Sequence, residues 1–264
     1  MQWFSKPLHD QGGERGVADG GYAPTVADRV LGLGGRQWLI VTAAVAAGYL
    51  LLSTIALAGL WANLHRAPTN AELQQAANVE VAGRWRAWTA GRIFPDRLPY
   101  VVVGESEYAH RIGMDSRTDC AGAVDEGLVP ILQRYGCQAV LRATYLDQLQ
   151  GIVITVGVVA FPDEQSAYQA RKQLPTDPTS LHALPLPGTA TARFTDPARQ
   201  DGSGERAGPY IILTTAGQTD GRPATTVRKG REGIFDAAPQ VAHAIAVPLA
   251  QRALPDCKGK EWAC

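Results

Sequence analysis

No charged side chain occurs between residues 37 and 64 of this chain of 264 residues. Within that stretch, Leu39 to Leu60 comprises 22 residues drawn only from Leu, Ile, Val, Ala, Gly, Ser, Thr and Tyr. A helix of this length spans about 33 Å, against about 30 Å for the hydrocarbon core of a bilayer. Trp38 and Trp61 flank the run, and aromatic rings prefer the headgroup level. We therefore predict a helix over residues 37–64 that crosses the lipid bilayer and satisfies its own backbone hydrogen bonds there.

Ala56-Leu57-Ala58 offers a second interpretation of the same stretch, because its small residues have the spacing of a signal-peptide cleavage site. About 18 apolar residues precede this site, whereas the apolar region of a signal peptide usually has about 7–15. The length favours a retained anchor. Cleavage after Ala58 stays open as the alternative.

No cysteine precedes residue 120, so every cysteine follows the apolar stretch. An even number of cysteines confined to one side of a membrane is typical of an oxidising exterior, where disulfides persist. Basic residues orient the chain only weakly, because four precede the stretch and three follow it closely. We predict a single-pass protein of the cell membrane, with a cytoplasmic N-terminus and an extracytoplasmic C-terminal domain. The four cysteines are Cys120, Cys137, Cys257 and Cys264.

The chain also lacks an excess of either charge, since 25 basic residues balance 25 acidic ones. A neutral domain has no electrostatic attraction for phosphate backbones, which argues against nucleic-acid binding. Residues 1–36 combine glycine and mixed charge with few large apolar side chains. Such a segment buries too little surface to offset chain entropy, so we predict a disordered cytoplasmic tail.

Residues 65–95 are predicted to form a juxtamembrane helix. Thr69 and Glu72 have the spacing of a capping box, in which each side chain bonds the backbone N–H of the other residue. An apolar stripe then recurs every four residues, at Leu73, Ala77, Val81 and Trp85. We expect this helix to be a spacer docked on the following domain. The alternative is a dimerisation stalk or a surface-lying helix with Arg84, Arg86 and Arg92 near lipid headgroups.

Residues 96–264 are predicted to form one extracytoplasmic α+β domain. Its first six elements follow the order strand, helix, strand, strand, helix, strand, which is the ferredoxin-like βαββαβ pattern with an antiparallel sheet and helices mostly on one face. An extra C-terminal strand and helix follow. The expected elements are Leu98–Val103, Asp119–Tyr135, Gln138–Tyr145, Gly151–Phe161, a helix from Asp163 to about Leu174, Thr189–Phe194, Tyr210–Ala216 and Ala237–Ala253.

Four cysteines allow three pairings. Cys257 and Cys264 enclose a short turn and pair easily, which leaves Cys120 with Cys137. These two bracket the expected helix, whose ends lie about 20 Å apart, whereas a disulfide needs Cα atoms within about 7 Å. Either the helix is broken, or the tail cysteines reach back to Cys120 and Cys137. The continuous apolar stripe favours the second pairing.

Motifs for catalysis, metals and cofactors are missing. Ser106 sits in a sequence similar to a nucleophile elbow, but that motif requires glycine where Tyr108 stands. The five histidines never pair at the spacing of a zinc-binding helix, and no glycine loop suits a phosphate. We predict no catalytic residue, no metal site and no cofactor. A hydrolase using Ser106 and His110 stays open as the weaker alternative.

Two polar loops are the best candidates for a binding site. One contains Asp196 and Arg199, and the other contains Asp220 and Arg222. Both flank the strand expected at 210–216. If the loops share one edge of the sheet, these four side chains line a polar cleft, whereas the alternative is turn chemistry alone, because Asp-Pro and Asp-Gly form turns.

Three runs carry a resemblance, namely GCQAVLRATYLDQLQGIVITVGVVAFP, RFTDPARQ and GPYIILTTAGQTDGR. They resemble a set of uncharacterised single-pass membrane proteins of actinobacteria that have a short N-terminal tail and an extracytoplasmic domain with a cysteine-bearing tail. The resemblance covers most of residues 37–264. It implies a Gram-positive cell-surface address, and no activity, ligand or site residue carries over from it.

Together these patterns favour a non-enzymatic, membrane-anchored extracytoplasmic domain that binds a ligand or a partner protein at the cell envelope. The first alternative is a transmembrane sensor or assembly factor whose N-terminal tail contacts a cytoplasmic protein. The second alternative is the envelope hydrolase.

Overall fold

The computed structural model describes residues 34–175, 180–223, 225 and 233–253, and the chain divides into two units, Met1–Ala67 and Pro68–Cys264. The first unit contains helix α1, Gly35–Leu64, which is long and apolar enough to cross a membrane. The hydroxyls of Thr42 and Thr54 donate to backbone carbonyls of the helix itself, at 2.9 Å and 2.8 Å. The expected helix is confirmed, beginning two residues early. The predicted disordered tail falls almost entirely on residues 1–33, outside the described part.

Helix α2, Asn70–Ala87, opens the second unit with the expected capping box. Thr69 N donates to Glu72 Oε2 at 2.8 Å, and Glu72 N donates to Thr69 Oγ1 at 3.3 Å. Ala77 and Val81 are buried, so the predicted stripe faces the domain. The helix ends before Arg92, and a short helix α3, Ala90–Ile93, leads to the sheet.

The unit is built on one curled sheet of six strands, and each neighbouring pair is antiparallel. The order across the sheet is β1-β2-β3-β4-β6-β5, which places β3 and β4 in the middle and β1 and β5 at the edges. The bounds are β1 Arg97–Val102, β2 Glu105–Met114, β3 Ala139–Leu146, β4 Ile152–Ala160, β5 Asp201–Ala207 and β6 Tyr210–Gln218.

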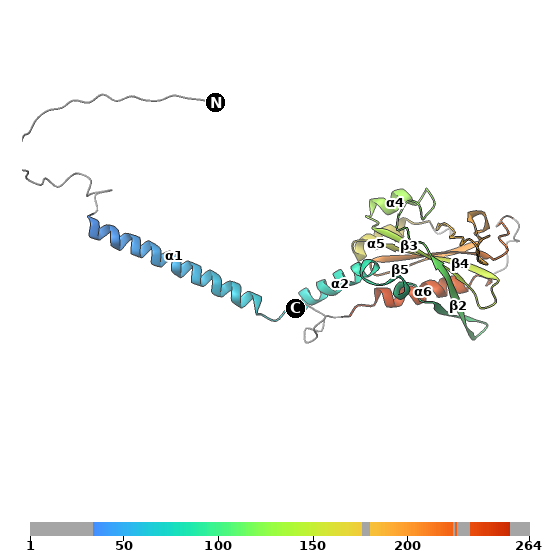
Figure 1. Cartoon of the computed structure of the whole chain (residues 1–264), viewed down its shortest axis with the longest axis horizontal. Coiled ribbons are helices and arrows are strands. Elements are labelled where there is room, and N and C mark those ends of the chain that lie inside the picture. Colours follow the sequence, from blue (N-terminus) through green and yellow to red (C-terminus); the bar gives the residue numbers. More distant parts are fainter. Residues whose placement is uncertain (1–33, 176–179, 224, 226–232, 254–264) are drawn as a thin grey trace, which may run out of the picture. The chain divides into compact units, whose positions relative to one another are not determined.

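Helices cover both faces of this sheet (Figure 1). On one face, Ile154, Val156 and Val158 pack with helix α6, Ala237–Ala250. On the other face, Val140, Val159 and Ile211 pack with α4, Val129–Arg134, and α5, Glu164–Gln173. Both faces of β4 are therefore covered, as its continuous apolar sequence predicts. The expectation of helices mostly on one face is wrong. Both edge strands contact α6, so the sheet curls around that helix.

The helix expected over Asp119–Tyr135 is wrong for most of its length, because only α4 is helical there. Asp119 accepts hydrogen bonds from Ala121 N and Gly122 N, which starts a turn. Val124 forms an isolated antiparallel bridge with Leu181, so its apolar side chain belongs to a loop. Pro130 then lies in the first turn of α4, where its missing N–H costs nothing.

The ferredoxin-like topology is not confirmed. A βαβ unit places its two strands parallel, whereas every pairing among the named strands is antiparallel. The strand expected over Thr189–Phe194 is wrong, since this stretch forms turns, and two strands, β2 and β5, come from stretches predicted as loops. The α+β class and the hairpin of β3 and β4 are confirmed.

Candidate functional site

A cavity of about 300 Å³ opens between α2 and the start of α5. Its walls come from four segments that lie far apart in the sequence: the middle of α2, the β4–α5 junction, the β5–β6 turn, and Arg252 just after α6. We call it the α2–α5 cleft. Its volume lies at the lower end of the range for pockets that hold small ligands, about 300–1,000 Å³.

The floor of the cleft is apolar and comes from Val79, Val81, Pro162 and Pro209. Phe161 N donates to Pro209 O at 3.0 Å, which holds the two proline-containing segments side by side. The turn before Pro209 needs glycine at residue 208, where φ is +55°. Val81 is buried, while Val79 is 66% exposed, so the floor continues onto an open apolar surface.

The rim of the cleft is polar, and its charges are compensated within it. The amides of Gln75, Asn78 and Gln165 lie along it, and each amide offers both donors and an acceptor. Glu164 accepts from Arg206 Nη1 at 3.0 Å and also from Arg252. A ligand would therefore meet amide groups beside a paired carboxylate. This combination suits a neutral polar group better than a free ion.

One wall of the cleft, α2, is held against the domain by a buried arginine. Arg84 is 5% exposed, and its Nη1 donates to the carbonyl oxygens of Pro248, Leu249 and Gln251 at 3.0, 3.0 and 2.8 Å. These oxygens belong to the C-terminal end of α6, where carbonyls lack helical partners and a cation is favourable. Arg84 also forms a two-pronged ion pair with Glu80, with contacts of 2.7–3.1 Å.

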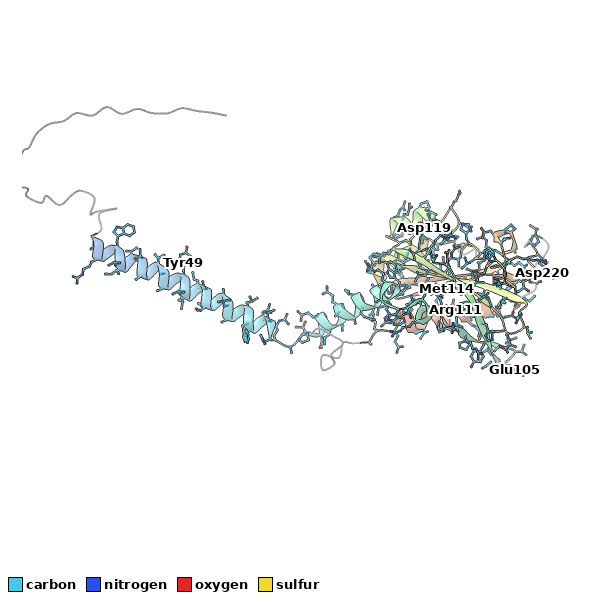
Figure 2. All side chains as sticks on the ribbon, viewed as in Figure 1. Tyr49, Glu105, Arg111, Met114, Asp119 and Asp220 are labelled. Carbon is cyan, nitrogen blue, oxygen red and sulfur yellow. A yellow bond between two sulfur atoms is a disulfide. The ribbon has the colours of Figure 1, made fainter. Side chains whose placement is uncertain are left out.

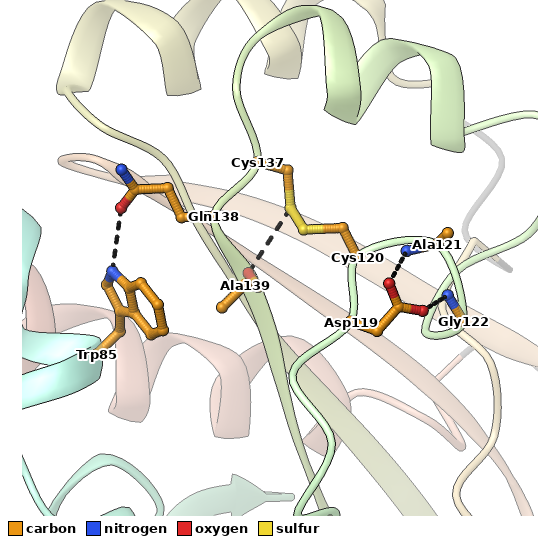
Figure 3. The surroundings of a disulfide bond; sticks show 8 residues. All are labelled: Trp85, Asp119, Cys120, Ala121, Gly122, Cys137, Gln138 and Ala139. Atoms are coloured by element: carbon orange, nitrogen blue, oxygen red, sulfur yellow. Dashed lines mark hydrogen bonds between the residues drawn. A yellow bond between two sulfur atoms is a disulfide. The ribbon is translucent and has the colours of Figure 1, made fainter. Parts of the chain in front are cut away.

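Further contacts fix the same face of α2. Tyr210 on β6 donates its hydroxyl proton to Val81 O at 2.5 Å, and burial raises the pKa of this phenol to about 12. Trp85 Nε1 donates to Gln138 Oε1 at 3.2 Å (Figure 3). The alternative that places Arg84 near lipid headgroups is therefore wrong, because this side chain is buried in the domain.

The first predicted loop carries a cluster of ion pairs. Arg199 forms a two-pronged pair with Asp125, at 2.9 and 3.1 Å, and its Nε lies 3.4 Å from Asp196 Oδ1. His182 Nδ1 lies 2.8 Å from Asp196 Oδ2 and 3.7 Å from Asp125 Oδ1. Ala183 N donates to Asp196 Oδ1 at 2.8 Å. The cluster therefore links three loops over one face of the sheet.

Asp220 and Arg222 of the second loop pair with each other, so the four predicted residues do not converge on one another. Hydrogen bonds from Arg222 hold the pKa of Asp220 below its usual range, and the same pairing raises the pKa of Arg222. The two loops touch through Gln200, whose Nε2 donates to Arg222 O at 3.0 Å. Figure 2 shows Asp220 at the outer surface of the unit.

A second cavity is much smaller, about 30 Å³, and it borders a buried ion pair. Arg142 Nη2 lies 2.6 Å from Asp115 Oδ2, and their side chains are 6% and 8% exposed. Burial acts to raise the pKa of Asp115, but hydrogen bonds from Arg117 and Arg142 outweigh it and lower that pKa. The cavity has room for about one water molecule, so this pair is a structural feature.

The arrangement of Ser106 and His110 argues against the hydrolase alternative. Both lie on β2, and four residues of strand separate their Cα atoms by about 13 Å. Their partners on the neighbouring strands also differ: Ser106 pairs with Val101, whereas His110 pairs with Arg97 and Leu146. Within the described residues, no group of three or more His, Cys, Asp or Glu side chains is placed to hold a metal ion.

Cys120 and Cys137 form a disulfide, with 6.5 Å between their Cα atoms (Figure 3). The favoured pairing of these two cysteines with the tail is therefore wrong. The argument failed because it assumed a long helix between them, whereas residues 119–128 form a loop that returns Cys120 to the start of β3. Cys257 and Cys264 lie outside the described residues.

The cleft was not predictable from sequence, because its walls join residues more than 100 positions apart and Arg84 resembles any surface arginine of an amphipathic helix. Only its position three residues after Val81, on the apolar stripe, was a signal. No family model, no curated protein and no solved structure matches this chain.

Proposed function

We propose that this chain is a membrane-anchored extracytoplasmic binding module, without enzymatic activity, that holds a partner or ligand of the cell envelope in the α2–α5 cleft. The observation that carries this proposal is the cleft itself, a cavity of about 300 Å³ with an apolar floor and a rim of amides and paired charges. Such a mixture of apolar surface and a few polar groups is typical of binding sites.

The proposed cellular location of the protein rests on two features. Helix α1 has the length and composition of a membrane span. The disulfide between Cys120 and Cys137 favours an oxidising compartment for the second unit. We place residues 1–36 in the cytoplasm and the Pro68–Cys264 unit outside, at the surface of the cell membrane.

Binding is favoured over catalysis by the chemistry of the cleft. Glu164 and Arg252 neutralise one another at the rim, and Asp163 accepts from Ser166 N at 2.7 Å as the cap of α5. These carboxylates are committed to structural partners, so neither is poised to move a proton. A neutral ligand, bound by apolar contact and amide hydrogen bonds, fits this lining.

Blocking the cleft tests the proposal. Val79→Arg puts a charged side chain into the apolar lining of the cleft. Val247→Arg is the matched control, because both valines are exposed helical residues, 66% and 50%. The full-length protein is purified from its native membrane after crosslinking, and recovered species are quantified by mass spectrometry. We expect Val79→Arg to lower recovery of the main species at least about fivefold, as for loss of an interface hot spot. Equal recovery with both variants would refute the cleft as the binding site.

A second candidate function is a transmembrane sensor. The attachment of α2 to α6 through Arg84 favours it, because only residues 65–69 separate α2 from α1. A change of domain position would then pass directly to the membrane helix. Inserting four glycines after Arg66 uncouples the two helices. If the protein is a sensor, the insertion abolishes its response to the bound species. If it is a simple tethered binder, the insertion leaves binding unchanged.

A further inference from the structure

The hairpin of β1 and β2 ends in a turn that strains its own first residue. Val102 pairs with Glu105, so the loop has two residues, Val103 and Gly104, with φ of +49° and +83°. Positive φ at both positions is the requirement of a type I′ turn, which favours Asn-Gly or Gly-Gly. A β-branched side chain at positive φ is a genuine outlier, because its Cβ crowds the backbone.

Packing by the described residues does not offset that strain. Val103 is 99% exposed, so its side chain makes essentially no contact with the rest of the unit. Strained residues persist where a function uses them, and the inference runs from the observed strain to a role. An apolar side chain held out at the end of a hairpin is placed for contact with something outside the domain.

The surroundings of Val103 extend the apolar surface. Val101 and Val102 are 49% and 39% exposed, and Tyr108 is 47% exposed. Tyr108 pairs with Pro99 across the hairpin, so these two side chains share the face that also carries Val101. We call Val101, Val102, Val103 and Tyr108 the hairpin tip. Figure 2 labels Glu105, which follows the turn, at the side of the unit away from α2.

The backbone edge of the same hairpin is closed. The side chain of Gln240 on α6 accepts from Val101 N at 2.8 Å and donates to Val101 O at 3.0 Å. Pro99 has no N–H to offer. A partner that adds a strand to this edge would have to displace Gln240, so contact through the exposed side chains of the tip is favoured over strand addition.

Charge identifies the kind of partner. Residues 98–110 contain two carboxylates, Glu105 and Glu107, and no lysine or arginine. Glu107 accepts a hydrogen bond from the Tyr100 hydroxyl at 2.5 Å, so Glu105 is the carboxylate that is exposed to a partner. Anionic lipid headgroups repel such a segment, since membrane surfaces attract basic ones. We propose that the hairpin tip docks into an apolar pocket of another protein, and that a basic side chain borders that pocket and faces Glu105. This surface is separate from the α2–α5 cleft and does not depend on it.

A first test separates strain from function. Val103→Asn places the favoured residue in the type I′ turn, so we expect the melting temperature to rise by about 2 °C in the full-length protein. The same variant removes the apolar contact and weakens docking. A variant that gains stability and loses binding cannot be explained by misfolding. A fall in the melting temperature would show that Val103 is held by contacts inside the domain and would overturn the proposal.

The second test measures docking directly. A photoreactive residue replaces Tyr108 in the full-length protein in its native membrane, and the adducts are resolved by mass with and without protease treatment. We expect a discrete protein adduct. Adding Val103→Asn or Glu105→Lys lowers its yield about fivefold or more, whereas Glu126→Lys, an exposed control outside the hairpin, leaves the yield unchanged.

Every other result overturns the proposal. An adduct to lipid, or binding of nanodisc-embedded protein to phosphatidylglycerol vesicles, makes the tip a membrane contact. A protein adduct whose yield ignores Glu105→Lys removes the basic pocket. Absence of any discrete adduct removes the docking surface altogether.

Discussion

The clearest structural prediction concerns Arg84, which joins α2 to the end of α6. In the variant Arg84→Met, an unbranched apolar side chain replaces the arginine. The ion pair with Glu80 and the hydrogen bonds to three carbonyl oxygens are then lost. Breaking a buried ion pair costs about 3–5 kcal/mol. Glu80 is 28% exposed and regains some hydration, so we take the lower end, about 3 kcal/mol.

The assay is thermal unfolding of the full-length protein in detergent, followed by near-ultraviolet circular dichroism. For a unit of about 200 residues, 1 kcal/mol shifts the melting temperature by about 2–4 °C, so we expect a fall of about 6–12 °C. Hydrogen exchange of α2 amides accelerates in the same variant, because the helix loses its anchor.

Two control variants sharpen this prediction. Arg84→Lys keeps the charge but lacks the planar fork, so we expect it to recover less than half of the lost stability. Glu80→Gln leaves the carbonyl contacts of Arg84 in place and costs about 1 kcal/mol. A fall of less than 2 °C for Arg84→Met would refute the reasoning, since it would mean that α2 docks through its apolar stripe alone.

Three further predictions follow from the same contacts. Asp115→Asn destabilises the unit by about 3 kcal/mol at pH 7, because the buried Arg142 loses its partner. Folding lowers the pKa of Asp115, so its contribution to stability is fully present above the pKa of the unfolded chain, about 3.9, and is lost as the pH falls through the lower pKa of the folded state. Urea unfolding curves of the variant and the wild type therefore converge in acid. Cys137→Ser opens the disulfide of sequence separation 17 and costs about 3 kcal/mol, and in a melting experiment the variant responds less to reductant than the wild type; an equal response of both proteins contradicts this. Gln240→Ala frees the backbone of Val101 at the sheet edge, and light scattering should show faster aggregation at unchanged melting temperature, whereas unchanged scattering would show that the edge is blocked by other means.

The sequence predicted those elements that are marked by a local signal, such as a capping residue or a continuous apolar run. The capping box of Thr69 and Glu72 marks the start of α2, and Asp163 marks the start of α5. The continuous apolar run of β4 predicts a strand covered on both faces, and nearly all residues of this strand are indeed buried. For the two helix starts, the deciding interaction lies within three residues of the signal.

The errors arose where distant contacts decide the structure. Val103-Gly104 is an unusual hairpin turn, so no strand was expected where β2 lies. The glycine-containing stretch of β5 has weak strand propensity and is ordered by pairing with β6. Val124 has helical spacing but lies in a loop, where it pairs with Leu181. Periodicity alone cannot distinguish these cases.

The candidate site illustrates the same limit. Asp196 and Arg199 were selected as polar side chains of a loop beside the strand expected at 210–216, and they do lie together, but their partners His182 and Asp125 come from other loops. The α2–α5 cleft depends on the fold bringing α2, α5 and the β5–β6 turn together. Whether either region binds a ligand stays a prediction.

The most direct test of the proposed function is photocrosslinking from position 79 in the full-length protein in its own membrane. A photoreactive residue replaces Val79 in one variant and Val247 in the other, since both positions are exposed on helices and only the first lies in the cleft. We predict a discrete adduct from position 79 and none from position 247. The same adducts from both positions, or none from either, would contradict a binding function for the cleft.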